Sequence, residues 1–188
     1  MQDILSTKVI YLLCYNLNMF LSPTHLIQKL NIPKGSTVVD FGSGSGAYIY
    51  PSLRAAGDTG KVIAVDINSE MLKTIESSSR VIGHTLHILT ANLEENIILP
   101  NFTADYVIFA NTLHQIENKE SLLREIKRVM TPMGTMLFVE WQENSKFGPA
   151  KDRKISKETA LGLFTKTGFT VIEELPAGDY HYAYTLKV

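Results

Sequence analysis

The sequence contains little cysteine and no clear arrangement of metal ligands. Cys14 is the only cysteine among 188 residues, so no internal disulfide can form. His84 and His87 are closely spaced, but they straddle the start of an expected strand and no third ligand lies near them in sequence. These absences favour a metal-free protein of a reducing compartment, which we expect to be cytoplasmic.

The sequence also lacks the ~18–20 consecutive apolar residues that a membrane span requires. An apolar run at residues 9–15 is followed by Asn16 and Asn18, and no small-residue cleavage site of a signal peptide comes after it. We interpret residues 1–21 as a peripheral segment that covers an apolar surface, and we expect no membrane partner. Two alternatives stay open: the segment forms a lid over the active site, or the start codon is misassigned.

Neither sign of charge is in excess. Lys and Arg number 18 and Asp and Glu 19, and 45% of the residues are hydrophobic. This balance is typical of a globular protein and gives no broad attraction to nucleic acid. A local basic cluster of Arg124, Lys127 and Arg128 fits the solvated face of a helix better than a nucleic-acid site. The length suits one domain, residues 1–188, with its core in residues 35–188.

Short apolar runs that alternate with helical periodicity are abundant. The candidate strands are residues 37–41, 61–65, 86–90, 105–110 and 135–140. Such strands are buried on both faces, as in a parallel sheet covered by helices. Asn68, Asn118 and Ser156 occupy helix N-cap positions, and Gly168 is placed to close the last helix. The pattern predicts an α/β fold.

The last two apolar runs predict a different connection. Residues 170–175 and 180–187 are separated only by residues 176–179, which include Pro176 and Gly178. A parallel crossover needs about a dozen residues or more, so these two runs should form an antiparallel hairpin.

The clearest motif lies at the end of the first expected strand. Residues 38–46 read VVDFGSGSG, so Gly42, Gly44 and Gly46 alternate directly after a buried strand. Glycine is required where the backbone turns with a positive φ or where a ligand must approach the main chain. A plain turn needs fewer glycines, so the motif predicts a ligand-binding loop before a helix N-terminus.

Asp66 follows the second expected strand, where its carboxylate can accept hydrogen bonds from both hydroxyls of a ribose. The loop alone also satisfies the dinucleotide pattern of nicotinamide-dependent oxidoreductases. Three features favour another class: Asp40 directly before the loop, the absence of room for a separate substrate domain, and the terminal hairpin.

These motifs resemble those of class I S-adenosylmethionine-dependent methyltransferases, from about Leu21 to Val188. The matching segments are residues 39–46, residues 62–66, and the stretch from residues 105–107 through 122–125 to 139–141. The chain is similar to the branch that includes the ubiquinone/menaquinone-biosynthesis C-methyltransferases and the arsenite methyltransferases. The resemblance implies a Rossmann-like seven-stranded sheet of order 3-2-1-4-5-7-6, with strand 7 antiparallel and helices on both faces.

The resemblance also implies a set of residues that bind S-adenosyl-L-methionine. The methionine portion would lie against the glycine loop with Asp40 near its ammonium group, and Asp66 would hold the ribose. The remaining implied contacts, around the adenine and beneath the sulfonium, are made by Ile67, Asn92, Leu93 and Asn111.

The chain departs from these relatives in three places. Asn92 stands where relatives usually have Asp, and Ala47 followed by Tyr48 stands where they have an aromatic directly after the third glycine. Residues 132–134 read Pro-Met-Gly where relatives usually have two glycines after the proline, and we expect them to form a type I turn.

Candidate catalytic residues come after the fourth and fifth expected strands. His114 lies on the loop that the resemblance places over the methyl group, and it is the first candidate for a general base. Glu140 ends the fifth strand at the same edge and is the second candidate, although the residue type and position slightly favour an exposed strand-end carboxylate. We expect both residues to act on the reaction without supporting the fold. His181 is interpreted as structural, because side chains of the hairpin alternate between two faces.

The sequence therefore predicts transfer of a methyl group from S-adenosyl-L-methionine to a small-molecule acceptor by in-line displacement. Two alternatives stay open: a catalytically silent S-adenosylmethionine-binding module, and a nicotinamide-dependent oxidoreductase. The acceptor and the oligomeric state do not follow from the residues.

Overall fold

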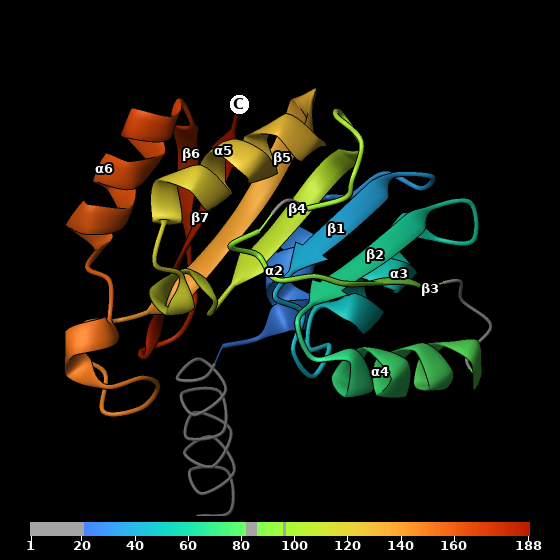
Figure 1. The fold of residues 1–188 in the computed structure, drawn as a ribbon, viewed down its shortest axis with the longest axis horizontal. Coiled ribbons are helices and arrows are strands. Elements are labelled where there is room, and N and C mark those ends of the chain that lie inside the picture. The colour runs from blue at the N-terminus through green and yellow to red at the C-terminus, as the bar shows by residue number, and fades with distance from the viewer. Residues whose placement is uncertain (1–20, 82–85, 96) are drawn as a thin grey trace, which may run out of the picture.

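A seven-stranded sheet runs through the computed structural model, which describes residues 21–81, 86–95 and 97–188 (Figure 1). All of the predicted peripheral segment except Leu21 lies outside these residues. The elements in chain order are α2 (Pro23–Lys29), β1 (Thr37–Phe41), α3 (Ile49–Ala56), β2 (Lys61–Asp66), α4 (Ser69–Val81), β3 (Leu86–Thr90), β4 (Ala104–Ala110), the 3₁₀ turn η1 (Leu113–Gln115), α5 (Lys119–Val129), β5 (Met130–Trp141), the 3₁₀ turn η2 (Lys151–Arg153), α6 (Lys157–Thr167), β6 (Thr170–Leu175) and β7 (His181–Lys187).

The sheet has the order β3-β2-β1-β4-β5-β7-β6, as predicted. The first five strands pair in parallel. β7 pairs antiparallel with both β5 and β6, which confirms the terminal hairpin. The C-terminal ends of β1, β2 and β4 therefore meet at one edge of the sheet, where the loops carrying the predicted site residues begin (Figure 1).

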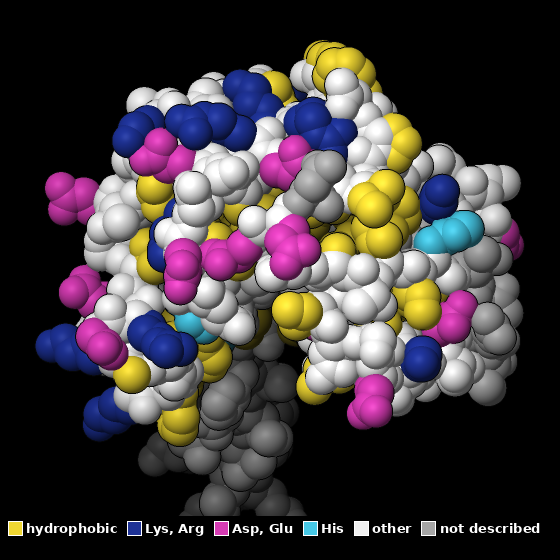
Figure 2. Space-filling model, in the orientation of Figure 1, with side chains coloured by type: hydrophobic (Ala, Val, Ile, Leu, Met, Phe, Trp, Pro, Cys, Tyr) yellow, Lys and Arg dark blue, Asp and Glu magenta, His cyan; other side chains and the backbone are white. Residues whose placement is uncertain are grey.

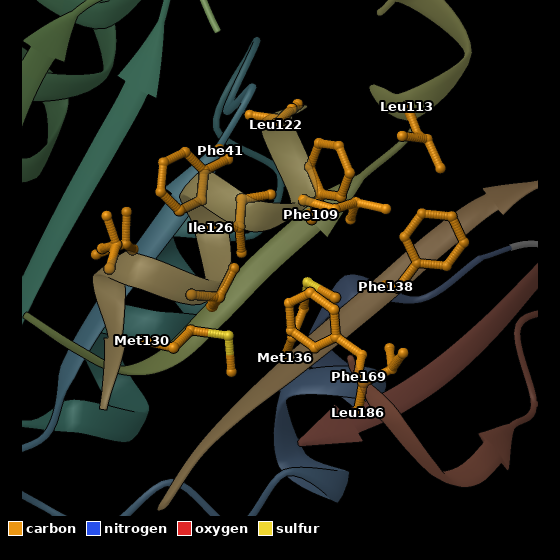
Figure 3. Close-up of a cluster of buried hydrophobic side chains, with 14 of the residues drawn as sticks. Phe41, Phe109, Leu113, Leu122, Ile126, Met130, Met136, Phe138, Phe169 and Leu186 are labelled. Carbon is orange, nitrogen blue, oxygen red and sulfur yellow. The ribbon is translucent and has the colours of Figure 1, made fainter. Parts of the chain in front are cut away.

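Helices cover both faces of the sheet, because the parallel strands are apolar on both sides. One cluster of buried side chains lies between the sheet and the helices α5 and α6 (Figure 3), with Phe109, Ile126 and Phe138 among its members. The second lies against α2, α3 and α4 and includes Leu26 and Leu72. Among the described residues, no helix is long and apolar enough to cross a membrane.

The helix ends follow the predicted capping residues. The side chains of Asn68, Asn118 and Ser156 accept backbone hydrogen bonds at the starts of α4, α5 and α6. Gly168 closes α6 in the left-handed conformation, with φ 80°. The side chains of the three N-cap residues each accept a backbone N–H that the first helical turn leaves without a partner.

The fifth strand is longer than predicted. It begins at Met130 and contains the segment that we expected to form a separate turn. The pairing register between β4 and β5 shifts between Ala104↔Met130 and Tyr106↔Thr135, so the extra residues are taken up within an irregular strand. The type I turn expected at residues 132–134 stays a prediction, because these residues lie in the stretch where the register shifts.

Both arginines of the basic cluster on α5 are paired with acidic residues of the same helix, and Lys127 donates to the carbonyl of Gly168. Arg124 contacts Glu120 at 3.1 Å, and Arg128 hydrogen-bonds Glu125. Figure 2 shows the Lys and Arg side chains over this region beside Asp and Glu side chains. This mixed charge agrees with the interpretation as a solvated helix face.

Candidate functional site

A pocket of about 600 Å³ opens at the C-terminal ends of β1, β2 and β4. This volume is in the range of small-molecule and cofactor sites. Most of the residues predicted to bind a cofactor line it, namely Asp40, Gly42, Gly44, Asp66, Ile67, Asn92, Leu93 and Asn111. The pocket therefore brings together residues that follow β1, β2, β3 and β4.

Gly42, Gly44 and Gly46 all have positive φ, but the surroundings that require a glycine differ among the three positions. A Cβ atom on Gly42 would lie 2.3 Å from Oγ1 of Thr112, and one on Gly46 would lie 3.0 Å from the Ile75 side chain. These two glycines are required by close packing within the protein. Gly44, with φ 49°, meets no protein atom within 4 Å and lines the pocket. Its missing side chain leaves space that a ligand can occupy.

Asp66 connects the glycine loop to the end of β2. Its Oδ2 accepts a hydrogen bond of 2.8 Å from the backbone N–H of Gly44, and its Oδ1 accepts one of 2.9 Å from the N–H of Asn68. A carboxylate has about four acceptor positions, so both oxygens can still accept from a ligand. Asp66 thus has a loop-ordering role that the sequence did not reveal.

Asp40 is a buried carboxyl group that faces the pocket. It is only 2% exposed, and its Oδ2 has no hydrogen-bond partner among the described residues. Burial, and then the negative charge of Asp66, raise the pKa of Asp40 from 3.8 to about 8. A buried carboxyl without a partner is costly, so this geometry is suited to a cationic ligand group.

The predicted adenine-facing residues lie at the far end of the pocket, beyond β2 and β3. Ile67 is 68% exposed, so its apolar side chain is open to a ligand surface. The amide of Asn92 is engaged within its own turn, where Nδ2 donates to Glu95 and Oδ1 accepts from the N–H of Glu94. This local pairing explains how Asn replaces an acidic residue here without leaving an unpaired group.

Several residues that line the pocket were not predicted. They include Tyr48, whose buried hydroxyl has no hydrogen-bond partner in the described part of the chain. Burial and the neighbouring Asp40 raise the pKa of this hydroxyl. Thr112, Gln115 and Ile116 close another wall, next to Asn111. Only Tyr48 carried a signal, since it is an aromatic residue two positions after the last glycine of the loop.

His114 and Glu140 form a hydrogen-bonded pair. Nδ1 of His114 lies 3.0 Å from Oε1 of Glu140, which also accepts the backbone N–H of Trp141 at 2.9 Å. The backbone N–H of His114 donates to Oε2 at 3.2 Å. Glu140 has no exposed surface, so the interpretation as an exposed strand-end carboxylate is wrong. The carboxylate favours the tautomer of His114 with its proton on Nδ1, which leaves Nε2 as the acceptor of the ring.

The pair does not line the cofactor pocket itself. Thr112, the N-cap of η1, and Gln115, its last residue, do line it. No group of three or more His, Cys, Asp or Glu side chains suited to a metal ion occurs within the described ranges. His84, considered above with His87, lies outside those ranges.

Comparisons with known proteins agree with this geometry. A family model described as "Methyltransferase domain" matches residues 39–138. The ubiquinone/menaquinone biosynthesis C-methyltransferase of Enterobacter sp. (strain 638) is 33% identical over 114 residues, which cover 60% of this chain and 45% of that protein. The demethylmenaquinone methyltransferase of Bacillus licheniformis is 29% identical over 122 residues, covering 65% and 52%.

A solved structure extends the similarity to nearly the whole chain. The S-adenosylmethionine-dependent methyltransferase of Aquifex aeolicus superposes with a TM-score of 0.82 and 26% identity, covering 92% of each chain. The chain spans about half the length of the curated relatives it matches. The chain therefore belongs to the methyltransferase-domain family, within the class I S-adenosylmethionine-dependent methyltransferases.

Proposed function

We propose that this chain transfers a methyl group from S-adenosylmethionine to a small-molecule acceptor. The observation that carries the proposal is the pairing, in one pocket, of a buried unpartnered carboxyl at Asp40 with the loop-bound carboxylate of Asp66. The two groups suit the two polar ends of this cofactor, an ammonium and a ribose.

The methionine end fits the region around Asp40 and Gly44. An ammonium group would provide the hydrogen-bond donor that Oδ2 of Asp40 lacks, and the backbone at Gly44 leaves room for close approach. The ribose fits Asp66, whose position is set by its two backbone hydrogen bonds. The adenine then lies toward Ile67 and Asn92.

The cofactor, when bound, supplies an already activated methyl group. The remaining task of the chain is to orient the acceptor and to exclude water. Where the acceptor carries a proton that must be removed, Nε2 of His114 is the candidate base. Glu140 orients this ring and stabilises its charged form, as a carboxylate does in other histidine pairs.

The acceptor is proposed to be a small molecule, because the matched relatives are named for methylation in quinone biosynthesis. The pocket is also of a size for one cofactor and a small partner. Titration calorimetry with S-adenosylhomocysteine, with NAD as the control, tests the cofactor assignment. Labelled-methyl transfer into fractions of a cell extract then tests turnover. Binding of NAD in place of S-adenosylhomocysteine would contradict the proposal.

Replacing Gly44 with Ala should weaken binding of S-adenosylhomocysteine at least tenfold. The added methyl group projects into the pocket, and the left-handed backbone costs about 1–2 kcal/mol with a side chain present. A matched control is Gly162→Ala in α6, where a Cβ also meets no atom. Calorimetry should show unchanged affinity in the control. Wild-type affinity in Gly44→Ala would place the ligand elsewhere.

The affinity for S-adenosylhomocysteine should increase with pH between about pH 6 and pH 8. The raised pKa of Asp40, about 8, keeps the carboxyl protonated in the free protein at neutral pH. Binding of an ammonium group requires the ionised form, so affinity rises by up to about tenfold per pH unit below the pKa and then levels off. In Asp40→Asn the affinity should be weaker and this slope should vanish. Equal slopes in both proteins would separate Asp40 from the ammonium group.

A further inference from the structure

Glu94 connects two loops at the end of the pocket where the adenine is proposed to lie. It belongs to the turn that follows β3, and it is one of the residues that line the pocket. Its Oε1 accepts a hydrogen bond from the backbone N–H of Glu117, which lies just before α5. One oxygen of this carboxylate therefore has a fixed protein partner, which joins the loop after β3 to the loop after η1.

The second oxygen of this carboxylate is available to a ligand. Oε2 of Glu94 makes no hydrogen bond within the part of the chain that the structure describes, and the residue is exposed. The described residues that line the pocket include no Lys, Arg or His, so no cationic side chain there competes for this oxygen. Because Oε1 is held by Glu117, the carboxylate is also restricted in its rotation.

The amide of Asn92, which the family resemblance places against the adenine, is already engaged. Its Oδ1 accepts the backbone N–H of Glu94 at 3.1 Å, and its Nδ2 donates to Oε1 of Glu95 at 3.0 Å. These two bonds fix the orientation of the amide within its own turn. One acceptor position remains on Oδ1, but it belongs to a neutral group, and hydrogen bonds to an ionised acceptor are about twice as strong. Glu94 therefore offers the stronger acceptor at this end of the pocket.

A carboxylate in this place distinguishes between purine bases. The exocyclic amino group of adenine donates hydrogen bonds. Hypoxanthine carries a carbonyl oxygen at the same position, and this oxygen can only accept. A carboxylate attracts the amino group and repels the carbonyl oxygen, so the two effects act in the same direction.

We infer that Glu94, rather than Asn92, accepts the hydrogen bond of the adenine amino group and determines the base specificity of the site. The inference rests on the proposed function, since it assigns one contact of the same cofactor. The acidic residue that relatives usually have at position 92 is replaced in this role by an acidic residue of the same turn. Asn92 is then a positioning residue, because its Oδ1 holds the backbone of Glu94.

Calorimetric titration of the full-length protein with S-adenosylhomocysteine and with S-inosylhomocysteine measures this specificity. The second ligand carries hypoxanthine in place of adenine and keeps the same ribose and amino-acid portion. We expect the wild-type protein to bind S-adenosylhomocysteine at least tenfold more tightly, because a site built to bond a donor rejects an analogue that lacks it.

Glu94→Gln should bring the two affinities to within about threefold of each other. The amide oxygen can keep the hydrogen bond from Glu117, and the amide nitrogen then replaces Oε2 and donates to the carbonyl oxygen of hypoxanthine. Glu95→Gln is the matched control. It removes the same charge from the same turn and keeps an acceptor for Asn92, but its side chain does not line the pocket. Its ratio of affinities should stay within twofold of wild type.

Asn92→Ser tests the alternative acceptor. A serine hydroxyl can accept the backbone N–H of Glu94 and so maintain the turn, while the amide is removed. The ratio of the two affinities should stay within twofold of wild type, even where both ligands bind more weakly. A purely structural role of Glu94 would weaken both ligands in Glu94→Gln and leave their ratio unchanged.

Four results would overturn the inference: similar affinities of the wild-type protein for the two ligands, an unchanged ratio in Glu94→Gln, an equal loss of discrimination in Glu95→Gln, or a loss confined to Asn92→Ser. Failure of the wild-type protein to bind S-adenosylhomocysteine is a different outcome. It would refute the proposed function first, and the role of Glu94 with it.

Discussion

Asp66→Ala should weaken binding of S-adenosylmethionine by about two decades. Two hydrogen bonds from ribose hydroxyls to a charged acceptor are worth roughly 1.5–3 kcal/mol each, less where water replaces the lost partner. A net loss of about 3 kcal/mol corresponds to this factor at 1.4 kcal/mol per decade. The variant also frees the N–H of Gly44, which the carboxylate holds at 2.8 Å. Loss of loop order should add to the effect.

The hydrogen bonds of Asp66 change the expected cost to the fold. A carboxylate that only faced a crevice would affect stability little, but Asp66 joins the glycine loop to the start of α4 through Gly44 and Asn68. We expect the free energy of unfolding to fall by about 1–2 kcal/mol. Calorimetric titration and denaturant unfolding of the same samples measure both quantities.

Asn68→Ala is the matched control for this experiment. It removes the N-cap of α4, at a cost of about 1 kcal/mol, and leaves the carboxylate of Asp66 in place. Its cofactor affinity should match wild type, and S-adenosylhomocysteine should lose affinity for Asp66→Ala in parallel with S-adenosylmethionine. Wild-type binding by Asp66→Ala would show that the ribose does not lie at the end of β2.

Local sequence signals predicted the elements of this fold well because each depends on near neighbours. The strand at residues 86–90 and the caps at Asn68, Asn118 and Ser156 follow from apolar runs and short-range hydrogen bonding. The hairpin follows from the length of its connection. The order of the strands came from the family resemblance, since no local pattern determines which strands become neighbours.

The polar pairs of the site were not predictable in the same way. Asn111 and His181 are 70 residues apart, and His114 and Glu140 are 26 apart, so their contacts exist only after the sheet has formed. The same limit applies to Glu140, where the alternative of an exposed carboxylate could not be excluded from residue type alone. Its burial follows from the neighbours that the fold places around it.

Glu140→Ala is expected to destabilise the fold strongly, which corrects our expectation that this residue acts on the reaction alone. The carboxylate is completely buried and accepts from the backbone N–H groups of His114 and Trp141 as well as from the imidazole. Its removal leaves these donors without their partner, at a cost of about 3–5 kcal/mol. For a chain of this length that corresponds to a fall of about 10 °C in Tm, measured by calorimetry.

Glu140→Gln separates the structural contribution from a catalytic one. The amide has nearly the same volume and its oxygen can keep the two donors at Oε1, whereas its NH2 group replaces Oε2 and leaves the backbone N–H of His114 without an acceptor, so we expect it to recover part of the lost Tm. It cannot stabilise a charged His114, so turnover with an acceptor that must lose a proton should still fall by about 10²–10⁴, as in His114→Ala. The affinity for S-adenosylhomocysteine should stay within twofold in both variants, because neither residue lines the cofactor pocket. Full turnover in Glu140→Gln together with a partly restored Tm would assign the pair to structure alone, since a neutral amide would then serve His114 as well as a carboxylate does.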